Sequence, residues 1–319
     1  MSAPLLSVEG LCVAFAGVRV VADVSISVGV GEAVGVVGES GSGKSVTALS
    51  VLRLIPSPPG QVEAGRVMFQ GTDLLGLPLA RMREFRGRDI AMVFQEPMAS
   101  LNPVMTVGEQ IAEAVMLHGD LDRAARRARA IEMLGLVGIP DPAGRYDAYP
   151  HQFSGGMRQR VMIAIALACN PRLLIADEPT TALDVTIQAQ VLDLLKRIRA
   201  QFGTAILLIS HDLGVIADIC ERVVVMYAGR VVEEADVRAI FRTPAHPYTR
   251  GLLASIPRLD DTCRRLHQIP GTVPNAARKR PGCPFAPRCP LREARCEEAM
   301  PPMVAHGPGQ RAACWVTAP

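Results

Sequence analysis

Short apolar runs separated by turns occupy most of the first 255 residues. Residues 5–15 and 18–28 have the alternating or β-branched pattern of strands, and Ala16-Gly17 between them predicts a tight turn. Later apolar runs are continuous, as in strands that are buried on both faces of a sheet. These continuous runs lie at residues 33–37, 90–94, 172–176 and 205–210. The pattern predicts an α/β fold that begins with an antiparallel β subdomain.

Two other segments carry apolar residues at helical spacing. Residues 122–138 are rich in Ala, Arg and Leu, with Ile131, Leu134 and Val137 three positions apart. After Asp184, apolar residues recur at intervals of three and four, at Ile187, Val191, Leu194, Leu195 and Ile198. We therefore predict one large domain over residues 1–255 with a helical insertion over about residues 97–160.

The composition separates the last part of the chain from the rest. With 319 residues, of which 49% are hydrophobic, the chain can bury a large core. Residues 256–319 hold eleven of the 25 prolines, five of the eight cysteines, and ten Lys/Arg against five Asp/Glu. We expect these residues to form a small Cys/Pro-rich C-terminal extension. Since no apolar run approaches the roughly 18 to 20 residues of a membrane span, we expect a soluble protein that reaches membranes through partners.

A phosphate-binding loop is the clearest chemical signal. Residues 38–45 fit the pattern G-x-x-x-x-G-K-[ST] and lie between the predicted strand 33–37 and a helix-compatible run from Val46. Glycines let consecutive backbone N–H groups face an anion, and the helix adds the positive end of its dipole. In such a loop Lys44 reaches the β- and γ-phosphates and the Ser45 hydroxyl binds Mg²⁺. The sequence therefore predicts a nucleoside triphosphate site.

Polar residues follow three of the predicted strands. Gln95 ends the run 90–94, Asp177 and Glu178 end the run 172–176, and His211 follows the run 205–210. We expect these ends to meet at one edge of the sheet, where ligands bind in open α/β sheets. An amide can ligate Mg²⁺ or orient water, Asp177 fits a magnesium position, and Glu178 fits the group that activates the attacking water. His211 can hydrogen-bond a γ-phosphate.

The segment Ser154-Gly155-Gly156 begins another predicted helix. Ser154 is a natural N-cap, and the two glycines expose N–H groups at the start of a long apolar run that ends at Cys169. Such a helix start can bind a phosphate, although the same three residues also form ordinary helix-start turns.

Taken in order, these motifs resemble the ATP-binding subunit of an ABC transporter, a P-loop NTPase with a RecA-like mixed sheet. The resemblance covers roughly residues 5–255. It implies ATP hydrolysis in a head-to-tail dimer, in which Ser154 and Gly156 act on the partner's nucleotide. The signature reads Phe153-Ser154-Gly155-Gly156-Met157, whereas the commonest form is Leu-Ser-Gly-Gly-Gln. The substitutions should leave the Ser and Gly phosphate contacts intact, but Met157 cannot replace a Gln side chain.

The resemblance also implies the residues of the ATP site. Glu178, His211 and Gln95 have the catalytic roles, and Ser45, Gln95 and Asp177 hold Mg²⁺. The residues that bind the nucleotide are Phe15, Gly38, Ser40, Gly41, Gly43, Lys44, Ser45, Thr47, Ser154, Gly155, Gly156 and Asp184. Phe15 would stack on the base, with ordinary core packing as an equal alternative.

A finer resemblance is to the dipeptide, oligopeptide and nickel importers. It rests on residues 38–43, 94–103, 149–160 and 246–249. It implies a subunit that powers import at the cytoplasmic face of the inner membrane, together with a second ATPase, related or identical, two permeases and, indirectly, a solute-binding protein. Nucleic acid is not an expected partner, since the net charge is only +3. The alternatives are a non-transport ABC ATPase and an ATP-binding regulatory subunit.

Four cysteines in the extension form a candidate metal site. Cys283, Cys289, Cys296 and Cys314 lie among Pro and Arg residues, in a segment too poor in apolar runs to build much core. The spacing lacks the paired C-x2-C units common in zinc sites, and the importer group resembles proteins with a [4Fe-4S] cluster here. We expect the cluster, with Zn²⁺ and free thiols as alternatives.

Overall fold

Two compact units make up the chain. The computed structural model describes residues 3–96, 100–181, 183–256, 268–273 and 281–318. Unit 1 consists of Met1–Leu5, Val28–Glu32 and Gly76–Ile209, and unit 2 consists of Leu6–Ser27, Ala33–Leu75 and Ser210–Pro319. Each unit is described separately below.

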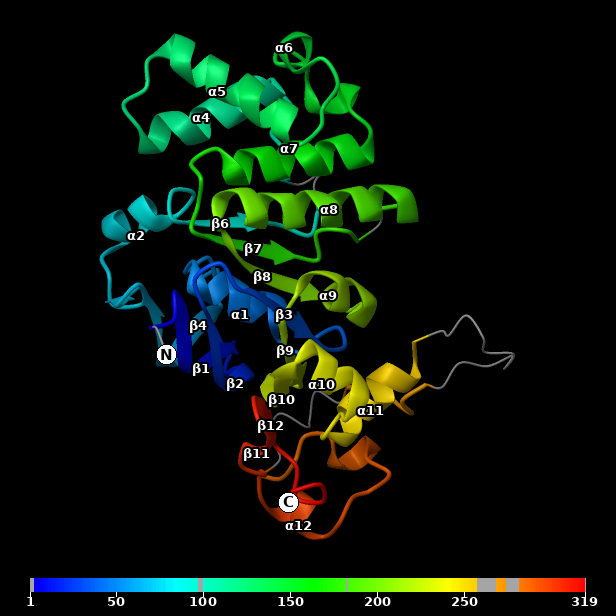
Figure 1. Ribbon diagram of the computed structural model, residues 1–319. Helices are drawn as coiled ribbons and strands as arrows, with labels where there is room; N and C mark the ends of the chain where they lie inside the picture. The colour runs from blue at the N-terminus through cyan, green and yellow to red at the C-terminus, as the bar shows by residue number, and fades with distance from the viewer. Residues whose placement is uncertain (1–2, 97–99, 182, 257–267, 274–280, 319) are drawn as a thin grey trace. The chain divides into compact units, whose positions relative to one another are not determined.

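Unit 1 combines a parallel sheet with a group of helices. Its strands run in the order β8, β7, β6, and both pairs are parallel. Helices α4, α5 and α7 pack against one another, in cyan and green in Figure 1. The elements are α2 (Leu79–Phe85), β6 (Ile90–Val93), α4 (Val107–His118), α5 (Arg123–Leu136), α6 (Pro142–Arg145), η1 (Pro150–Gln152), α7 (Gly155–Leu167), β7 (Leu173–Asp177), α8 (Val185–Phe202) and β8 (Ala205–Ser210).

Three helices of unit 1 begin at residues whose side chains accept hydrogen bonds from the N–H groups of the first turn. The Asp122 carboxylate accepts a hydrogen bond from Ala125 N–H at 2.8 Å at the start of α5, and Asp184 accepts one from Ile187 N–H at 2.9 Å at the start of α8. Thr106 forms a capping box with Glu109 before α4. These caps satisfy N–H groups that have no partner within the helix. The prediction of helices after Asp122 and Asp184 is confirmed.

Unit 2 begins with an antiparallel sheet of strand order β2, β1, β4, β5. Ala16 and Gly17 both have positive φ, 47° and 77°, and they form the predicted tight turn between β1 and β2. The elements of the unit are β1 (Leu6–Phe15), β2 (Val18–Val28), β3 (Ala33–Val37), α1 (Lys44–Val51), β4 (Gly60–Phe69), β5 (Thr72–Asp73), α9 (Leu213–Ile219), β9 (Arg222–Tyr227), β10 (Arg230–Asp236), α10 (Val237–Arg242), α11 (Pro247–Ala254), η3 (Ala286–Arg288), α12 (Arg295–Glu298), β11 (Val304–Gly307) and β12 (Gln310–Ala312).

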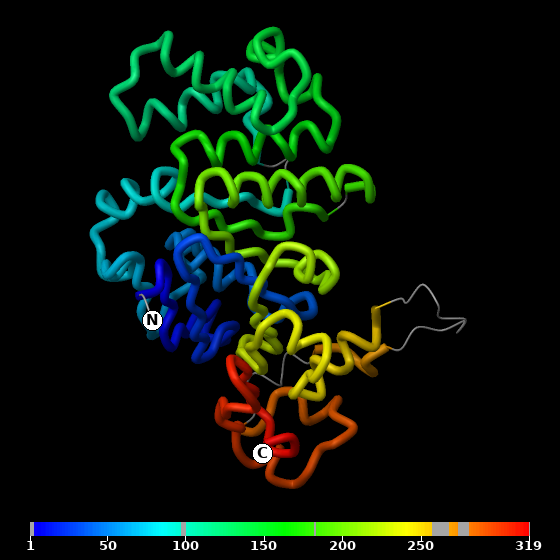
Figure 2. The backbone as a smooth tube through the Cα atoms, viewed as in Figure 1, coloured from blue at the N-terminus to red at the C-terminus, as the bar shows by residue number. Residues whose placement is uncertain are grey.

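A mixed group of strands in unit 2 includes the end of the chain. β3 lies parallel to β9, β9 lies antiparallel to β10, and β12 pairs with β10 and β11. Figure 2 follows the chain from the orange segment around α12 to the red strands beside β10. The segment that composition marks as an extension therefore adds two strands to this sheet, and these cover the side of β10 that faces away from β9.

A buried carboxylate fastens the last strands to unit 2. Glu233 on β10 is fully buried, and its oxygens accept hydrogen bonds from Ala245 N–H at 2.8 Å, His246 N–H at 2.9 Å and Gln310 Nε2 at 3.0 Å. Three donors satisfy a charge whose burial would otherwise be costly. Because Gln310 belongs to β12, this network stabilises the pairing of β12 with β10.

Among the helices that the structure describes, none is long and apolar enough to cross a bilayer.

Candidate functional site

The phosphate loop lies in unit 2 between β3 and α1. Lys44 is only 6% exposed, and its ammonium donates hydrogen bonds to the carbonyl oxygens of Gly38 at 2.8 Å and Glu39 at 3.1 Å. The Thr47 hydroxyl of α1 donates to the carbonyl oxygen of Gly43, the N-cap residue, at 2.9 Å. The loop thus folds back on its own lysine, which places a buried positive charge inside the turn of residues 38–44.

The geometry of this loop fits a bound phosphate group. A Cβ on Gly38 would lie 2.2 Å from Met226 O, and Gly43 has a φ of 99°, so both positions require glycine. The Ser42 hydroxyl is buried and has no hydrogen-bond partner among the described residues. A buried polar atom without a partner, in the same loop as a buried lysine, matches a loop that completes its hydrogen bonds with an anion.

The carboxylate site lies in unit 1 at the end of β7. Asp177 is the last residue of β7 and is 5% exposed. The Glu178 carboxylate accepts hydrogen bonds from Gln95 Nε2 at 3.1 Å and from Thr181 Oγ1 at 2.8 Å, both through Oε2. The structure therefore brings Gln95 and Glu178 together. Thr181, which sequence reasoning missed, contributes a second donor.

Glu178 has an unusual backbone conformation. Its φ is 47°, in the left-handed region that residues with a Cβ rarely adopt. Its N–H donates to Ile209 O on β8 at 3.0 Å, which holds the turn in place. A strained residue at the end of a buried strand is typical of a functional position.

The predicted residues are divided between the two units. Gln95, Asp177 and Glu178 belong to unit 1, whereas Lys44 and His211 belong to unit 2. His211 directly follows β8, as the run 205–210 predicts. Convergence of all five residues on one triphosphate stays a prediction.

Ser154 and the two glycines lie at the start of α7 in unit 1. Ser154 Oγ accepts a hydrogen bond from Met157 N–H at 3.4 Å, and so caps the helix. A Cβ on Gly155 would meet nothing within 4 Å, whereas a Cβ on Gly156 would lie 2.5 Å from Ile187 Cγ2. The glycines therefore differ in role: Gly156 permits close contact with α8, and Gly155 faces open space.

Two other predicted nucleotide ligands have structural partners. Asp184 caps α8. Phe15, at the end of β1, pairs with Gly60 on β4, and its ring atom Cε1 lies 2.9 Å from where a Gly60 Cβ would stand. Both contacts are compatible with a further role in binding. The neighbouring Ala182 lies outside the described residues.

The four cysteines of the C-terminal segment line one small cavity, of about 10 Å³. Burial raises the pKa of the Cys283 thiol to about 11 and also raises the pKa of Cys289. Among the described residues, no group of three or more Cys, His, Asp or Glu side chains could hold a metal ion. The geometry therefore gives no support to the expected [4Fe-4S] cluster or to Zn²⁺, although the four cysteines share a cavity.

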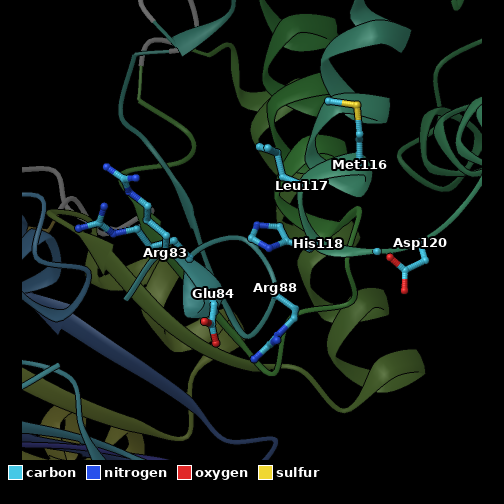
Figure 3. Close-up of a pocket in the computed structure, with 9 residues that line it drawn as sticks. Arg83, Glu84, Arg88, Met116, Leu117, His118 and Asp120 are labelled. Atoms are coloured by element: carbon cyan, nitrogen blue, oxygen red, sulfur yellow. The ribbon is translucent and has the colours of Figure 1, made fainter. Parts of the chain in front are cut away.

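Sequence reasoning also missed a basic pocket in unit 1, of about 590 Å³. Arg83, Arg86 and Arg88 line it on one side, and Met116 and Leu117 at the end of α4 line the other. Glu84 and Asp120 are also part of the lining, so the arginines exceed the carboxylates by one. Figure 3 shows the His118 imidazole between these groups. Burial, followed by the charge of Arg88, lowers the pKa of His118. No motif marks this pocket, because its residues come from two segments with ordinary composition.

Comparison with protein families gives two matches. The family described as ABC transporter matches residues 21–181, and the family described as oligopeptide/dipeptide transporter, C-terminal region, matches residues 232–296. The second match covers most of β10, all of α11 and three of the four cysteines of the cavity.

Similar proteins and structures agree with these families. A protein of Sinorhizobium fredii, named as a peptide ABC transporter ATP-binding protein, is 55% identical over 93% of this chain and 89% of its own length. A protein of Brucella abortus, named as a peptide import ATP-binding protein, is 50% identical over 98% of this chain and 95% of its own. A solved dimeric ATP-binding cassette, bound to ADP and phosphate after hydrolysis, has a TM-score of 0.65 at 28% identity and covers 73% of this chain and 99% of its own. A component of an ABC transporter complex from Clostridium perfringens has a TM-score of 0.66 at 25% identity, over 76% of this chain and 92% of its own.

Proposed function

Because this chain belongs to the ABC transporter family of ATP-binding proteins, we propose that it hydrolyses ATP to power the import of peptides through separate permease subunits. The observation that supports this most directly is the Glu178 carboxylate, which Gln95 and Thr181 hold at the end of a buried strand. A carboxylate fixed in this way can accept a proton from water. The names of the relatives support peptides as the cargo.

In this proposal the phosphate loop binds the triphosphate. Lys44 exchanges the carbonyl oxygens of Gly38 and Glu39 for β- and γ-phosphate oxygens, and the Ser42 hydroxyl gains a partner. Ser45, Gln95 and Asp177 are the residues assigned to hold Mg²⁺, which neutralises charge on the phosphates.

Hydrolysis then depends on the residues that follow β7 and β8. Glu178 orients water in line with the γ-phosphate and takes its proton, while His211 hydrogen-bonds the γ-phosphate. Gln95 already donates to Glu178, so a change at Glu178 during hydrolysis can move the Gln95 amide and with it the segment after β6. A regulatory subunit that binds ATP without hydrolysis would need none of this geometry. A phosphate-release assay with the cognate permeases distinguishes the two functions.

We assign the start of α7 to the nucleotide of a second ATPase subunit. Gly155 has open space around it, and the first N–H groups of a helix of 13 residues attract anions. The related cassette bound to ADP and phosphate is a dimer. The second subunit is either a related chain or a second copy of this one, and non-transport ABC ATPases with two cassettes in one chain are the alternative class.

The basic pocket of unit 1 is the surface we assign to the permease. Met116 and Leu117 are adjacent and are 50% and 68% exposed, so they form an apolar surface beside the charged groups of the pocket that a partner could cover. The three arginines outnumber Glu84 and Asp120 in the same lining, and this small excess of positive charge suits an acidic or carbonyl-rich helix end. The expected occupant is a short amphipathic helix of the permease, which would hold the subunit peripherally at the cytoplasmic face of the membrane.

Glutamate at Met116 and Leu117 should uncouple this subunit from its permeases. Burying two new carboxylates in an apolar contact is costly, so we expect peptide uptake into vesicles to fall by roughly tenfold or more. ATP hydrolysis by the purified subunit should change by less than about twofold, since exposed substitutions perturb the fold little. Val30→Glu, at an exposed apolar residue of the β2–β3 turn, is the matched control and should leave uptake unchanged. Full peptide uptake in the double variant would mean that the permease does not dock on Met116 and Leu117.

We also propose that the four-cysteine cavity holds an inorganic centre, a [4Fe-4S] cluster in preference to Zn²⁺. The support is the family resemblance and the fact that all four cysteines line one cavity, although as placed in the described part of the chain they do not form a ligand set. Their deprotonation needs a bound cation, because burial raises the pKa of Cys283.

Metal analysis of anaerobically purified protein tests this proposal. We expect about four iron and four acid-labile sulfide per chain, and loss of both in Cys289→Ser. One zinc per chain with no sulfide would show that the centre is zinc. Absence of iron and zinc, with Cys283, Cys289, Cys296 and Cys314 all free thiols, would overturn the proposal.

A further inference from the structure

The second residue of the phosphate loop, Glu39, is held by residues far along the chain. Its carboxylate oxygens accept hydrogen bonds from Arg288 Nη1 at 3.0 and 2.9 Å. Its N–H donates to the Tyr248 hydroxyl at 2.8 Å, and its carbonyl oxygen accepts from Lys44. All four residues belong to unit 2, and every polar group of Glu39 has a partner.

Arg288 is itself fixed in place. Its side chain is 6% exposed, and every nitrogen of the guanidinium donates a hydrogen bond. Nε donates to Pro270 O at 2.8 Å, Nη2 donates to Ile269 O and Gly271 O at 3.2 Å, and Nη1 also reaches the Tyr227 hydroxyl at 3.3 Å. A cation held by this many acceptors cannot turn away from Glu39 without leaving several of them unsatisfied. The position of the Glu39 side chain is therefore set by the C-terminal segment.

Tyr248 fixes the direction of the Glu39 peptide group. The tyrosine is fully buried, with its ring 4.6 Å from Tyr227 and 5.4 Å from Phe285. Its N–H donates to His246 Nδ1, and burial lowers the pKa of His246 to about 3, so the imidazole stays neutral and accepts. Because these contacts fix the tyrosine, its hydroxyl holds the Glu39 N–H in one direction. The N–H groups left for phosphate are those of later residues in the loop.

We infer that Arg288 is a positioning residue for ATP binding: it neutralises Glu39 and holds the phosphate loop in the conformation that receives the triphosphate. This inference rests on the proposed ATP site in residues 38–45. Without Arg288, Glu39 would be a free carboxylate within the loop that binds an anion of several negative charges, and the two would repel. The loop would also lose the restraint that keeps its N–H groups in position before the nucleotide arrives.

Variants that neutralise Arg288 alone, or Arg288 together with Glu39, distinguish an effect of charge on ATP binding from a loss of folded structure. Arg288→Ala should raise the Kd and KM for ATP by roughly 5- to 30-fold, because a charge-assisted contact is lost and Glu39 is left unpaired, while kcat changes less than about threefold. Adding Glu39→Gln removes the repelling charge and should restore KM to within about threefold of the wild type. Arg288→Lys, which keeps the charge but not the fork, should give an intermediate KM.

Arg292→Ala is the matched control, since Arg292 is exposed and its ion pair with the exposed Glu297 carboxylate is long, at 3.7 Å. The Tm of each variant verifies that it is folded. A normal KM in Arg288→Ala, or a raised KM that Glu39→Gln leaves unchanged, overturns the inference. Lys44→Ala runs alongside: if it too binds ATP normally, the proposed site is wrong, whereas a defect in Lys44→Ala with a normal Arg288→Ala removes only the role of Arg288.

Discussion

Replacing Glu178 with glutamine should abolish ATP turnover and leave ATP binding intact. The two side chains have the same shape, and the glutamine carbonyl oxygen can still accept hydrogen bonds from Gln95 and Thr181, which now donate to Glu178 Oε2 at 3.1 and 2.8 Å. What is lost is the negative charge that accepts a proton from the attacking water. General-base catalysis contributes roughly 10²- to 10⁴-fold, so phosphate release should fall by at least about 100-fold.

The same variant should accumulate as a closed dimer in the presence of ATP. Closure needs the phosphates of bound ATP, and reopening needs their hydrolysis, so a protein that binds but does not hydrolyse stays closed. Size-exclusion chromatography with and without ATP measures this directly. Glu132→Gln on α5, an exposed carboxylate paired with Arg129, is the control and should retain turnover and remain sensitive to nucleotide. Wild-type phosphate release from Glu178→Gln would remove Glu178 from its assigned role.

Local chemistry explains why much of the fold could be predicted. Asp122 and Asp184 mark helix starts because a short acidic side chain can reach the free N–H groups of a first turn, and both residues do so. The turn at Ala16-Gly17 follows from two adjacent strand patterns and a glycine. The phosphate loop is specified by its own glycines and lysine. Each of these signals lies within a few residues of the structure it determines.

Contacts between distant segments could not be predicted in this way. Arg288 and Glu39 are 249 positions apart, and Arg288 lies in a proline-rich segment with no periodic pattern. Strands β11 and β12 have only four and three residues, too short for a reliable alternation, and they form because β10 offers a free edge. Residues 246–249 support the family resemblance, but nothing in the sequence shows that Tyr248 binds the phosphate loop.

The cysteines show a different limit. The family resemblance predicts that Cys283, Cys289, Cys296 and Cys314 share an inorganic centre; they line one cavity, but as placed they form no metal-binding group among the described residues. Spacing does not define the distances or directions of four sulfurs, which depend on turns such as η3 and α12 and on the strand pairing of residues 304–312. The coordination geometry depends on these distances and directions, so the identity of a metal centre cannot be derived from the positions of the cysteines in the sequence alone.

Removal of the Lys44 side chain should have the largest effect on ATP affinity. Lys44 is the first residue of α1 and is 6% exposed, and its ammonium contacts two carbonyl oxygens of the loop. These carbonyl oxygens are neutral acceptors. When ATP binds, charged oxygens of the β- and γ-phosphates would take their place and form stronger hydrogen bonds with the ammonium. Since a hydrogen bond to a charged group contributes about 1.5 to 3 kcal/mol, losing two of them should weaken ATP binding by roughly 100-fold or more in Lys44→Ala.

Lys196→Ala, on the exposed face of α8, removes the same side chain away from the loop and should bind ATP as the wild type does. Titration with ATP in the presence of Mg²⁺ measures both variants. Lys44→Arg separates the effect of charge from that of side-chain shape. The arginine keeps the positive charge, but its bulkier guanidinium does not fit the turn formed by Gly38 and Gly43. Recovery of affinity in Lys44→Arg would mean that charge alone binds the phosphates. Failure to recover would mean that the loop selects the slender lysine side chain as well as its charge, as the close approach of Gly38 to Met226 indicates.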